Sequence, residues 1–205
     1  MTILSKRNEE PARASRPFDA DADGMVLSEG AAVLVLESEE LARQRGARCY
    51  GRLAGVASIT EPAVAMPSPV EAGRAIQAAL REPTLLQSEI DYVCAYGSAM
   101  LALDRIETDA VNRIFGRAAA ERLTLSAPKS MLGHLLGAAG LVDAIVCLKA
   151  IETGVIPPTI NLERPAEGCD LDYTPGEARR QVVRHALCYA YAFGGHHVAL
   201  CFSAP

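Results

Sequence analysis

The sequence lacks tryptophan, and aromatic residues make up only 5% of the chain. No apolar run approaches the ~18 residues that a membrane span needs, and residues 1–10 lack the apolar core of a signal peptide. The formal net charge is −5. An acidic chain with few aromatics is a poor candidate for binding nucleic acid. We therefore expect a cytoplasmic protein with no membrane span and no nucleic-acid partner.

Metal and disulfide patterns are also missing. The cysteines have no CxxC spacing and stand mostly in apolar stretches, which favours buried, reduced thiols. They are Cys49, Cys94, Cys147, Cys169, Cys188 and Cys201. His196 and His197 are adjacent, so in a strand they would point to opposite faces and not share a metal. The stretch 133–140, GHLLGAAG, does not have the GxGxxG spacing of a dinucleotide site. We expect neither a metal nor a tightly bound cofactor.

Half of the residues are hydrophobic, enough for a sizeable core in 205 residues. Apolar runs with β-branched residues predict strands, and 3.6-residue periodicity predicts helices. The expected strands cover residues 31–37, 49–59, 91–95, 123–125, 186–192 and 198–202. The expected helices cover residues 38–46, 68–81, 104–115 and 133–153. Ser68, Pro69 and Glu71 predict a capping box at the second helix. This alternation favours a layered α/β fold, with the apolar last helix buried between layers. The polar segment before residue 30 is expected to be irregular, with Pro17-Phe18 in a docked loop.

Residues 129–134, KSMLGH, are the most distinctive pattern. His134 is expected at the start of the long helix, where the helix dipole would keep its imidazole neutral. A neutral imidazole can donate a hydrogen bond to a thioester oxygen or an oxyanion. Asp143, inside the same apolar helix, needs a partner, and Lys129 is the nearest cation in sequence. A core histidine and a purely structural ion pair are the alternatives.

Phe193, Gly194 and Gly195 lie between the last two predicted strands. Such a turn could present backbone N–H groups to an anion or a thioester, although a plain hairpin turn has the same pattern.

Together these segments resemble the β-ketoacyl-acyl-carrier-protein synthases. The resemblance rests on SRPFDADADGMVLSEGAAVLVLE (residues 15–37), KSMLGHLLGAAG (129–140), PPTINLERPAEGCDLDY (157–173) and FGG (193–195). It implies a thiolase-like layered fold. Residues 1–48 would be the end of the N-terminal half, with its last strands, and residues 49–205 the C-terminal half, with a mixed sheet packed between helices.

The resemblance also implies roles for individual residues. His134 would be the family's second catalytic histidine and Lys129 its active-site lysine. Asp143 would replace the glutamate that this lysine usually meets. Phe193 would be the gating phenylalanine of the glycine-rich loop. Asp104 and Glu107 match acidic positions that follow the first histidine.

The sequence departs from the family pattern at the first histidine motif, usually HGTxTPxGD. Residues 96–104 read YGSAMLALD, so Tyr96 stands at the histidine position. Ser98 and Met100 stand where two threonines contact phosphopantetheine. The final loop reads GGHH where the family usually has GGTN. The surface for the phosphopantetheine arm of a carrier protein, the expected substrate arm, is therefore more apolar.

The resemblance implies a full length about twice that of this chain, with a nucleophilic cysteine in the first half. None of the six cysteines stands in that motif. We therefore expect a chain that cannot condense acyl groups alone, and a hetero-oligomer with an N-terminal ketosynthase half or a complete ketosynthase, together with acyl carrier protein.

Three hypotheses remain. The chain could be a subunit of a split ketosynthase of fatty-acid or type II polyketide synthesis. It could be a non-catalytic partner like a chain-length factor. It could also be an inactive module that binds carrier proteins.

Overall fold

The computed structural model describes residues 3–62, 67–81, 85–120 and 122–205. A five-stranded sheet in the order β1-β7-β6-β2-β3 forms its centre. β7 is antiparallel to both its neighbours, whereas β2 is parallel to β6 and β3, so the sheet is mixed. Its strands are β1 (Arg52–Thr60), β2 (Tyr92–Cys94), β3 (Thr124–Ser126), β6 (His185–Ala192) and β7 (His196–Ser203). A second sheet pairs β4 (Val155–Ile156) with β5 (Arg179–Arg180).

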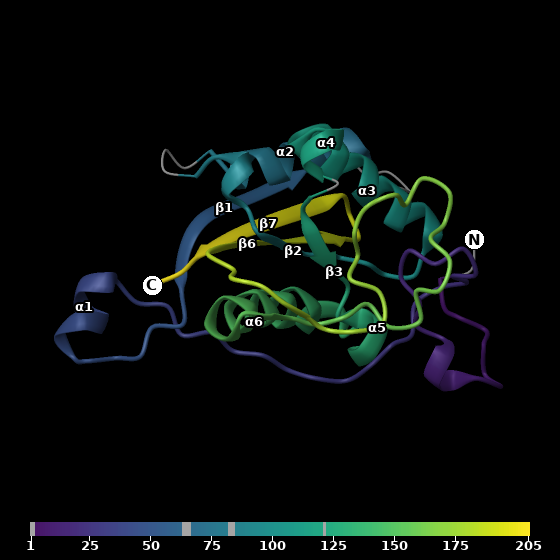
Figure 1. Cartoon of the computed structure of the whole chain (residues 1–205), viewed down its shortest axis with the longest axis horizontal. Helices are drawn as coiled ribbons and strands as arrows, with labels where there is room; N and C mark the ends of the chain where they lie inside the picture. The colour runs from purple at the N-terminus through teal and green to yellow at the C-terminus, as the bar shows by residue number, and fades with distance from the viewer. Residues whose placement is uncertain (1–2, 63–66, 82–84, 121) are drawn as a thin grey trace.

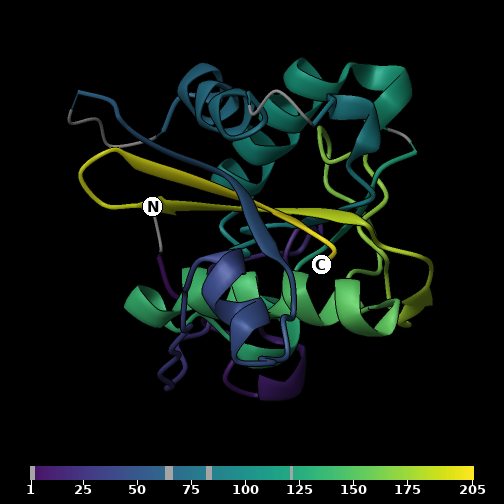
Figure 2. The same ribbon diagram turned by 90° about the vertical axis from the view of Figure 1, so that its left-hand side faces the viewer.

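Helices cover both faces of the main sheet (Figures 1 and 2). On one side lie α2 (Pro69–Ala79), α3 (Leu101–Phe115) and α4 (Arg117–Ala120). On the other lie α5 (Lys129–Leu132) and α6 (Ala139–Thr153). The remaining helices are α1 (Glu39–Gln44) and the 3-10 turns η1 (Pro11–Arg13), η2 (Gln87–Glu89) and η3 (Leu136–Ala138).

Alternation along the strands gives each sheet face its own hydrophobic core. On β6, Leu187 and Tyr189 belong to the cluster with α2 and α3, whereas Ala186 and Cys188 belong to the cluster with α6. Gly55 in β1 permits the close approach of α2, because a Cβ atom there would lie 1.9 Å from the Ala79 carbonyl oxygen.

The N-terminal arm is docked, as predicted for Pro17-Phe18. Phe18 is fully buried, and its ring stacks on Tyr173 with 3.9 Å between the centroids. The buried Asp19 carboxylate accepts hydrogen bonds from the amides of Glu163 and Arg164. These amides and the Arg16 guanidinium hold the pKa of Asp19 below its ordinary value, against the opposing effect of its burial.

The predicted strand at residues 31–37 is wrong. Described residues 3–48 contain isolated bridges such as Leu4 with Met25 but no strand in a sheet. The side chains of Val33, Val35 and Leu36 are 70–84% exposed. Their β-branched, apolar character predicted a buried strand, but in this chain no neighbouring strand supplies hydrogen bonds to that segment.

The long helix predicted from residue 133 is interrupted. α5 ends at Leu132, Gly133 has a positive φ of 73°, and α6 begins only at Ala139. The expected helix start at His134 is therefore wrong, and so is the helix dipole as the cause of its neutrality. α6 is also not buried all round, because Leu141 is 39% exposed.

The other predicted elements form, with small shifts of their ends. Ser68 caps α2 by accepting from the Val70 amide, but the capping box is wrong. Glu71 pairs with Arg74, and the Ser68 amide donates to the Glu61 carboxylate instead. Cys49 is exposed, contrary to expectation, whereas the other five thiols are buried.

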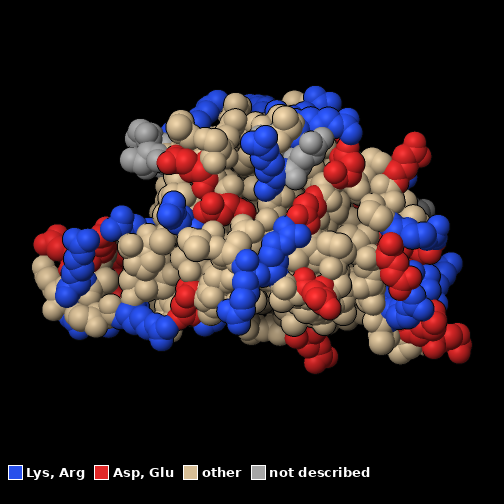
Figure 3. All heavy atoms as spheres, viewed as in Figure 1, with Lys and Arg blue, Asp and Glu red and all other residues tan. Residues whose placement is uncertain are grey.

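Charges of both signs are interspersed on the face shown in Figure 3, without a continuous basic stripe. Within the described residues, the longest apolar helices fall short of the length and hydropathy needed to cross a bilayer.

Candidate functional site

Lys129 and Asp143 form a buried ion pair between α5 and α6. The Lys129 Nζ atom lies 2.6 Å from Asp143 Oδ2, and each side chain is 3% exposed. Burial raises the pKa of Asp143, and the ammonium group of Lys129 opposes that rise. The same Nζ atom lies 5.0 Å from the centre of the Tyr96 ring, within the range of a cation–π contact. The predicted pair is confirmed, and it adjoins Tyr96.

His134 lies in the short segment between α5 and η3, where backbone contacts fix it. Its amide donates to the Val26 carbonyl oxygen, and its own carbonyl oxygen accepts from the Ser28 amide. The side chain is 6% exposed. Burial lowers the imidazole pKa to about 4, and Lys129 contributes in the same direction. His134 is therefore neutral at physiological pH, for a reason other than a helix dipole.

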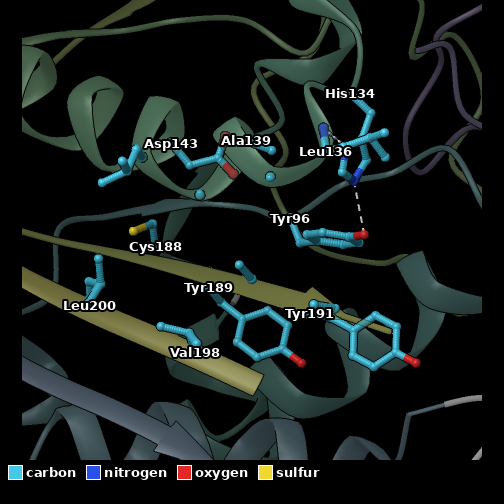
Figure 4. Close-up of a pocket in the computed structure, with 15 residues that line it drawn as sticks. Tyr96, His134, Leu136, Ala139, Asp143, Cys188, Tyr189, Tyr191, Val198 and Leu200 are labelled. Atoms are coloured by element: carbon cyan, nitrogen blue, oxygen red, sulfur yellow. Dashed lines mark hydrogen bonds between the residues drawn. The ribbon is translucent and has the colours of Figure 1, made fainter. Parts of the chain in front are cut away.

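The hydrogen-bond network assigns the His134 proton to Nε2. The Leu136 amide donates to Nδ1 at 3.0 Å, so Nδ1 must carry a lone pair. Nε2–H then donates to the Tyr96 hydroxyl oxygen, also at 3.0 Å (Figure 4). Because the hydroxyl oxygen accepts from the imidazole, the Tyr96 O–H hydrogen remains available to another acceptor. Burial raises the pKa of Tyr96, with Glu107 and Asp104 adding to the rise, so the hydroxyl stays protonated.

Two buried carboxylates shape the loop that begins at Tyr96. Glu107 accepts from the amides of Tyr96 at 2.7 Å and Gly97 at 2.9 Å. Asp104 accepts from the amides of Ser98 at 3.0 Å and Phe18 at 2.9 Å. Burial raises the pKa of Glu107 to about 7 and that of Asp104 to about 6. Their hydrogen bonds hold the backbone of this loop in place, and the supporting role predicted for both residues stays a prediction.

A pocket of about 330 Å³ opens beside the His134–Tyr96 pair (Figure 4). Its walls are mostly apolar and come from η3, the start of α6 and strands β6 and β7. They include Gly137, Gly140, Leu141, Ala190, Val198 and Leu200. Such a pocket suits an aliphatic chain attached to a polar group at the His134–Tyr96 end.

The glycine turn does not belong to this pocket. Phe193 is 77% exposed, and Gly194 and Gly195 adopt positive φ angles of 87° and 79° in the β6–β7 turn. Ser98 is buried, and its hydroxyl donates to the Asp104 carboxylate. Met100 precedes α3 as its N-cap residue. The roles predicted for these five residues stay predictions.

Sequence reasoning missed Tyr189 and Tyr191 of β6, which border the pocket with their rings on the α2–α3 side of the sheet (Figure 4). The available signal was their i, i+2 spacing in a strand next to the glycine turn, which puts both rings on one face.

The fold and the site define a layered α/β protein with a neutral histidine and a buried lysine–carboxylate pair beside an apolar pocket. Residues 50–163 match the family model described as "Beta-ketoacyl synthase, C-terminal domain", and residues 1–42 match "Beta-ketoacyl synthase, N-terminal domain". The chain belongs to the β-ketoacyl synthase family.

Three relatives illustrate this. The 3-oxoacyl-[acyl-carrier-protein] synthase 2 of Synechocystis sp. is 44% identical over 97% of this chain and 48% of its own length. A structure of a type II PKS acyl-carrier protein in complex with its ketosynthase matches with a TM-score of 0.93 and 34% identity, over 99% of this chain and 50% of that one. The ishigamide ketosynthase/chain length factor matches with a TM-score of 0.89 and 37% identity, over 94% and 47%. The chain thus spans about half the length of these relatives.

Removing one partner of the buried ion pair should destabilise the fold. We expect Asp143→Ala to lower the free energy of unfolding by about 3–5 kcal/mol, because it leaves the Lys129 ammonium buried without a counter-charge. The combination Lys129→Met with Asp143→Leu should recover most of this loss, since apolar residues often replace a buried pair at little cost. Chemical denaturation measures both. A double variant as unstable as Asp143→Ala would contradict the explanation.

The His134 imidazole should titrate with a pKa near 4 and carry its proton on Nε2 at neutral pH. Because this pKa is below the ordinary value of 6.5, His134 contributes full stability above pH 6.5 and loses it as the pH falls toward 4. NMR of the imidazole carbons and nitrogens, assigned by loss of the signal in His134→Gln, measures both properties. A midpoint near 6.5, or an Nδ1–H tautomer, would refute the assignment.

Proposed function

We propose that this chain forms the C-terminal part of a ketosynthase-type site that acts on acyl-carrier thioesters in fatty-acid or type II polyketide synthesis. We further propose that the site favours acyl transfer or acyl holding over decarboxylative condensation. The observation that carries this proposal is the hydrogen bond from His134 Nε2–H to the Tyr96 hydroxyl oxygen. It joins two hydrogen-bond donors in series, so the pair offers a ligand one terminal O–H.

The proposed chemistry follows from that donor arrangement. In the family, two histidines help to stabilise the enolate formed when malonyl carrier protein loses carbon dioxide. Tyr96, proposed to stand at the position of the first of them, occupies the donor of the second. Loss of one positioned donor typically costs about 10²–10³-fold in rate. A thioester carbonyl can still be polarised by the Tyr96 hydroxyl, whose donor strength the imidazole supports from behind.

The nucleophilic thiol is proposed to come from an N-terminal ketosynthase half. Burial raises the pKa of Cys94, Cys169 and Cys201, which disfavours the reactive thiolate. Cys188 lines the pocket but is 4% exposed, and its free thiol makes a hydrogen bond with the Cys147 thiol in the sheet–α6 core. These thiols are poorly suited to acyl loading, and a positioned base is needed to activate one.

The exposed segment at residues 33–36 supports a partner half. Val33, Leu34, Val35 and Leu36 line a groove of about 820 Å³ together with α1 and the approach to β1. An exposed apolar segment without strand partners is suited to pairing with another chain's sheet edge. The proposed substrate arm is the phosphopantetheine of an acyl carrier protein, which enters along Ser98 and Met100. No tightly bound cofactor is proposed.

A chain-length-factor-like role is the second candidate. The similarity to a ketosynthase/chain length factor and the single terminal donor both favour it. In that role the pocket would shape an acyl tunnel for a complete ketosynthase, and His134 would not be needed for turnover. An inactive carrier-binding module is the third candidate, in which no thioester would react.

The partner prediction concerns assembly. We expect the chain to co-purify with an N-terminal ketosynthase half in a hetero-oligomer, and the joint substitution Val33→Asp and Val35→Asp to abolish the complex in size-exclusion chromatography. Val182→Asp, at an apolar residue that is 73% exposed between β5 and β6, is the matched control. A stable monomer in the presence of the partner half, or equal losses in both variants, would refute this surface.

The chemical prediction compares two reactions of the assembled complex. His134→Ala should reduce acyl transfer to carrier protein by about 10²–10³-fold, as expected for a lost donor. Tyr96→His should raise decarboxylation of malonyl carrier protein by at least about tenfold, because two parallel donors are restored. Leu86→His, at an exposed residue that lines neither the pocket nor the groove, is the control. Mass spectrometry of the carrier thioesters measures both reactions.

The outcomes separate the candidates. Acyl transfer that is lost in His134→Ala supports the split ketosynthase. If a complete ketosynthase with this chain as its partner turns over equally fast with His134→Ala, the chain-length-factor role is supported. If the wild-type complex decarboxylates malonyl carrier protein as fast as the Tyr96→His complex, the donor argument fails.

A further inference from the structure

A second buried hydrogen-bond chain lies on the α2–α3 side of the sheet. His197 is fully buried on β7, with its Nδ1 atom 2.5 Å from the Tyr189 hydroxyl and its Nε2 atom 3.2 Å from Glu61 Oε1. Tyr189 is 3% exposed and Glu61 is 5% exposed. Three polar side chains in an apolar core need a reason, because each must be fully partnered there.

Glu61 anchors this chain to two other elements. Its carboxylate accepts from the Ser68 amide at the start of α2, in place of the capping box that the sequence predicts. Its own amide donates to the Gly195 carbonyl oxygen at 3.0 Å. The end of β1, the start of α2 and the β6–β7 turn therefore meet at Glu61.

The order carboxylate, imidazole, hydroxyl is the order of a hydrolase triad, but here it cannot serve that chemistry. In a triad the hydroxyl must reach a substrate. The Tyr189 hydroxyl is directed to His197 inside the core, and burial raises its pKa further, so it stays protonated. A role in holding neighbouring groups is the physical alternative.

The neighbour that matters is Tyr191. It pairs with His197 across β6 and β7, and the two ring centres are 5.4 Å apart. The Tyr191 ring also meets the Tyr96 ring edge-on, at 6.4 Å and 89°. Tyr96 in turn meets His134 edge-on, at 5.5 Å and 79°. A continuous row of rings therefore runs from His197 to His134 (Figure 4 shows its Tyr191, Tyr96 and His134 members).

We propose that Glu61, His197 and Tyr189 are positioning residues that fix Tyr191, and through it the ring of Tyr96 against His134. Phenol rings turn about Cα–Cβ, and a loosely held Tyr96 would lose the geometry of its bond with Nε2–H. The hydrogen-bond chain holds His197 at both ring nitrogens, so the face against which Tyr191 packs is rigid. The effect of these positioning residues on acyl transfer rests on the proposed function, whereas their effect on the position of Tyr96 does not.

The test uses NMR of the full chain with carbon-13 in tyrosine and nitrogen-15 in histidine. Tyr189→Phe keeps the ring and deletes the hydroxyl, and His197→Asn removes the imidazole. Both should shift or broaden the Tyr96 and His134 signals, as should Tyr191→Leu. His196→Asn is the matched control, because His196 is the adjacent imidazole on the exposed face and bonds to Thr60.

Unchanged Tyr96 and His134 signals in Tyr189→Phe and His197→Asn would overturn the proposal. Equal changes in His196→Asn would also count against it, because they would indicate a general disturbance of the hairpin.

In the assembled complex, Tyr189→Phe should lower kcat for acyl transfer between about 10- and 100-fold with little change in KM, as expected when a reacting group is misplaced. If the NMR signals shift and wild-type acyl transfer is absent, the proposed function fails and this inference stands. If acyl transfer is present and the NMR signals do not move, the proposed function stands and this inference fails.

Discussion

The hydrogen bond from the Leu136 amide to His134 Nδ1 determines what this site can do. It fixes the tautomer, so the remaining donor of the imidazole points at the Tyr96 hydroxyl. The bond exists because the chain breaks between α5 and α6, where Gly133 and Leu136 both adopt positive φ angles. A continuous helix through this segment would use the Leu136 amide for an intrahelical bond and leave the tautomer unassigned.

Other residues of the site bury this bond and hold its two partners in place. The N-terminal arm holds the His134 backbone through Val26 and Ser28, although the arm is more than 100 residues away in sequence. Lys129 and Asp143 place a buried charge pair beneath the Tyr96 ring, and Glu107 fixes the Tyr96 backbone. The positive charge of Lys129 also disfavours an imidazolium at His134, so one residue supports both the tyrosine and the neutral histidine.

Local patterns could predict much of this from sequence. The hairpin at the C-terminus, the Ser68-Pro69 start of α2 and the Lys129–Asp143 pair all follow from spacing, propensity and the need to neutralise a buried charge. The interruption before α6 could not be predicted, because the apolar pattern of residues 133–153 continues through it. The strand at residues 31–37 failed for the opposite reason: strand propensity describes a fit to neighbours, and the described chain places none beside that segment.

The contacts of Tyr189 and His197 could not be predicted from sequence patterns. Each looks like an ordinary strand residue, and neither position predicts the Glu61 carboxylate that completes their chain, since Glu61 lies 136 residues before His197. Only the antiparallel pairing of β1 with β7 brings them together. The resemblance implies an asparagine at the position of His197 in the family, and this shorter side chain would not span Tyr189 and Glu61 in the same way. If Tyr96 replaces a histidine, as proposed, its larger ring offers more surface for Tyr191 to pack against. Under the positioning role proposed above, the Tyr96 hydroxyl at the pocket depends on the polar contacts of Glu61, His197 and Tyr189 on the other side of the sheet.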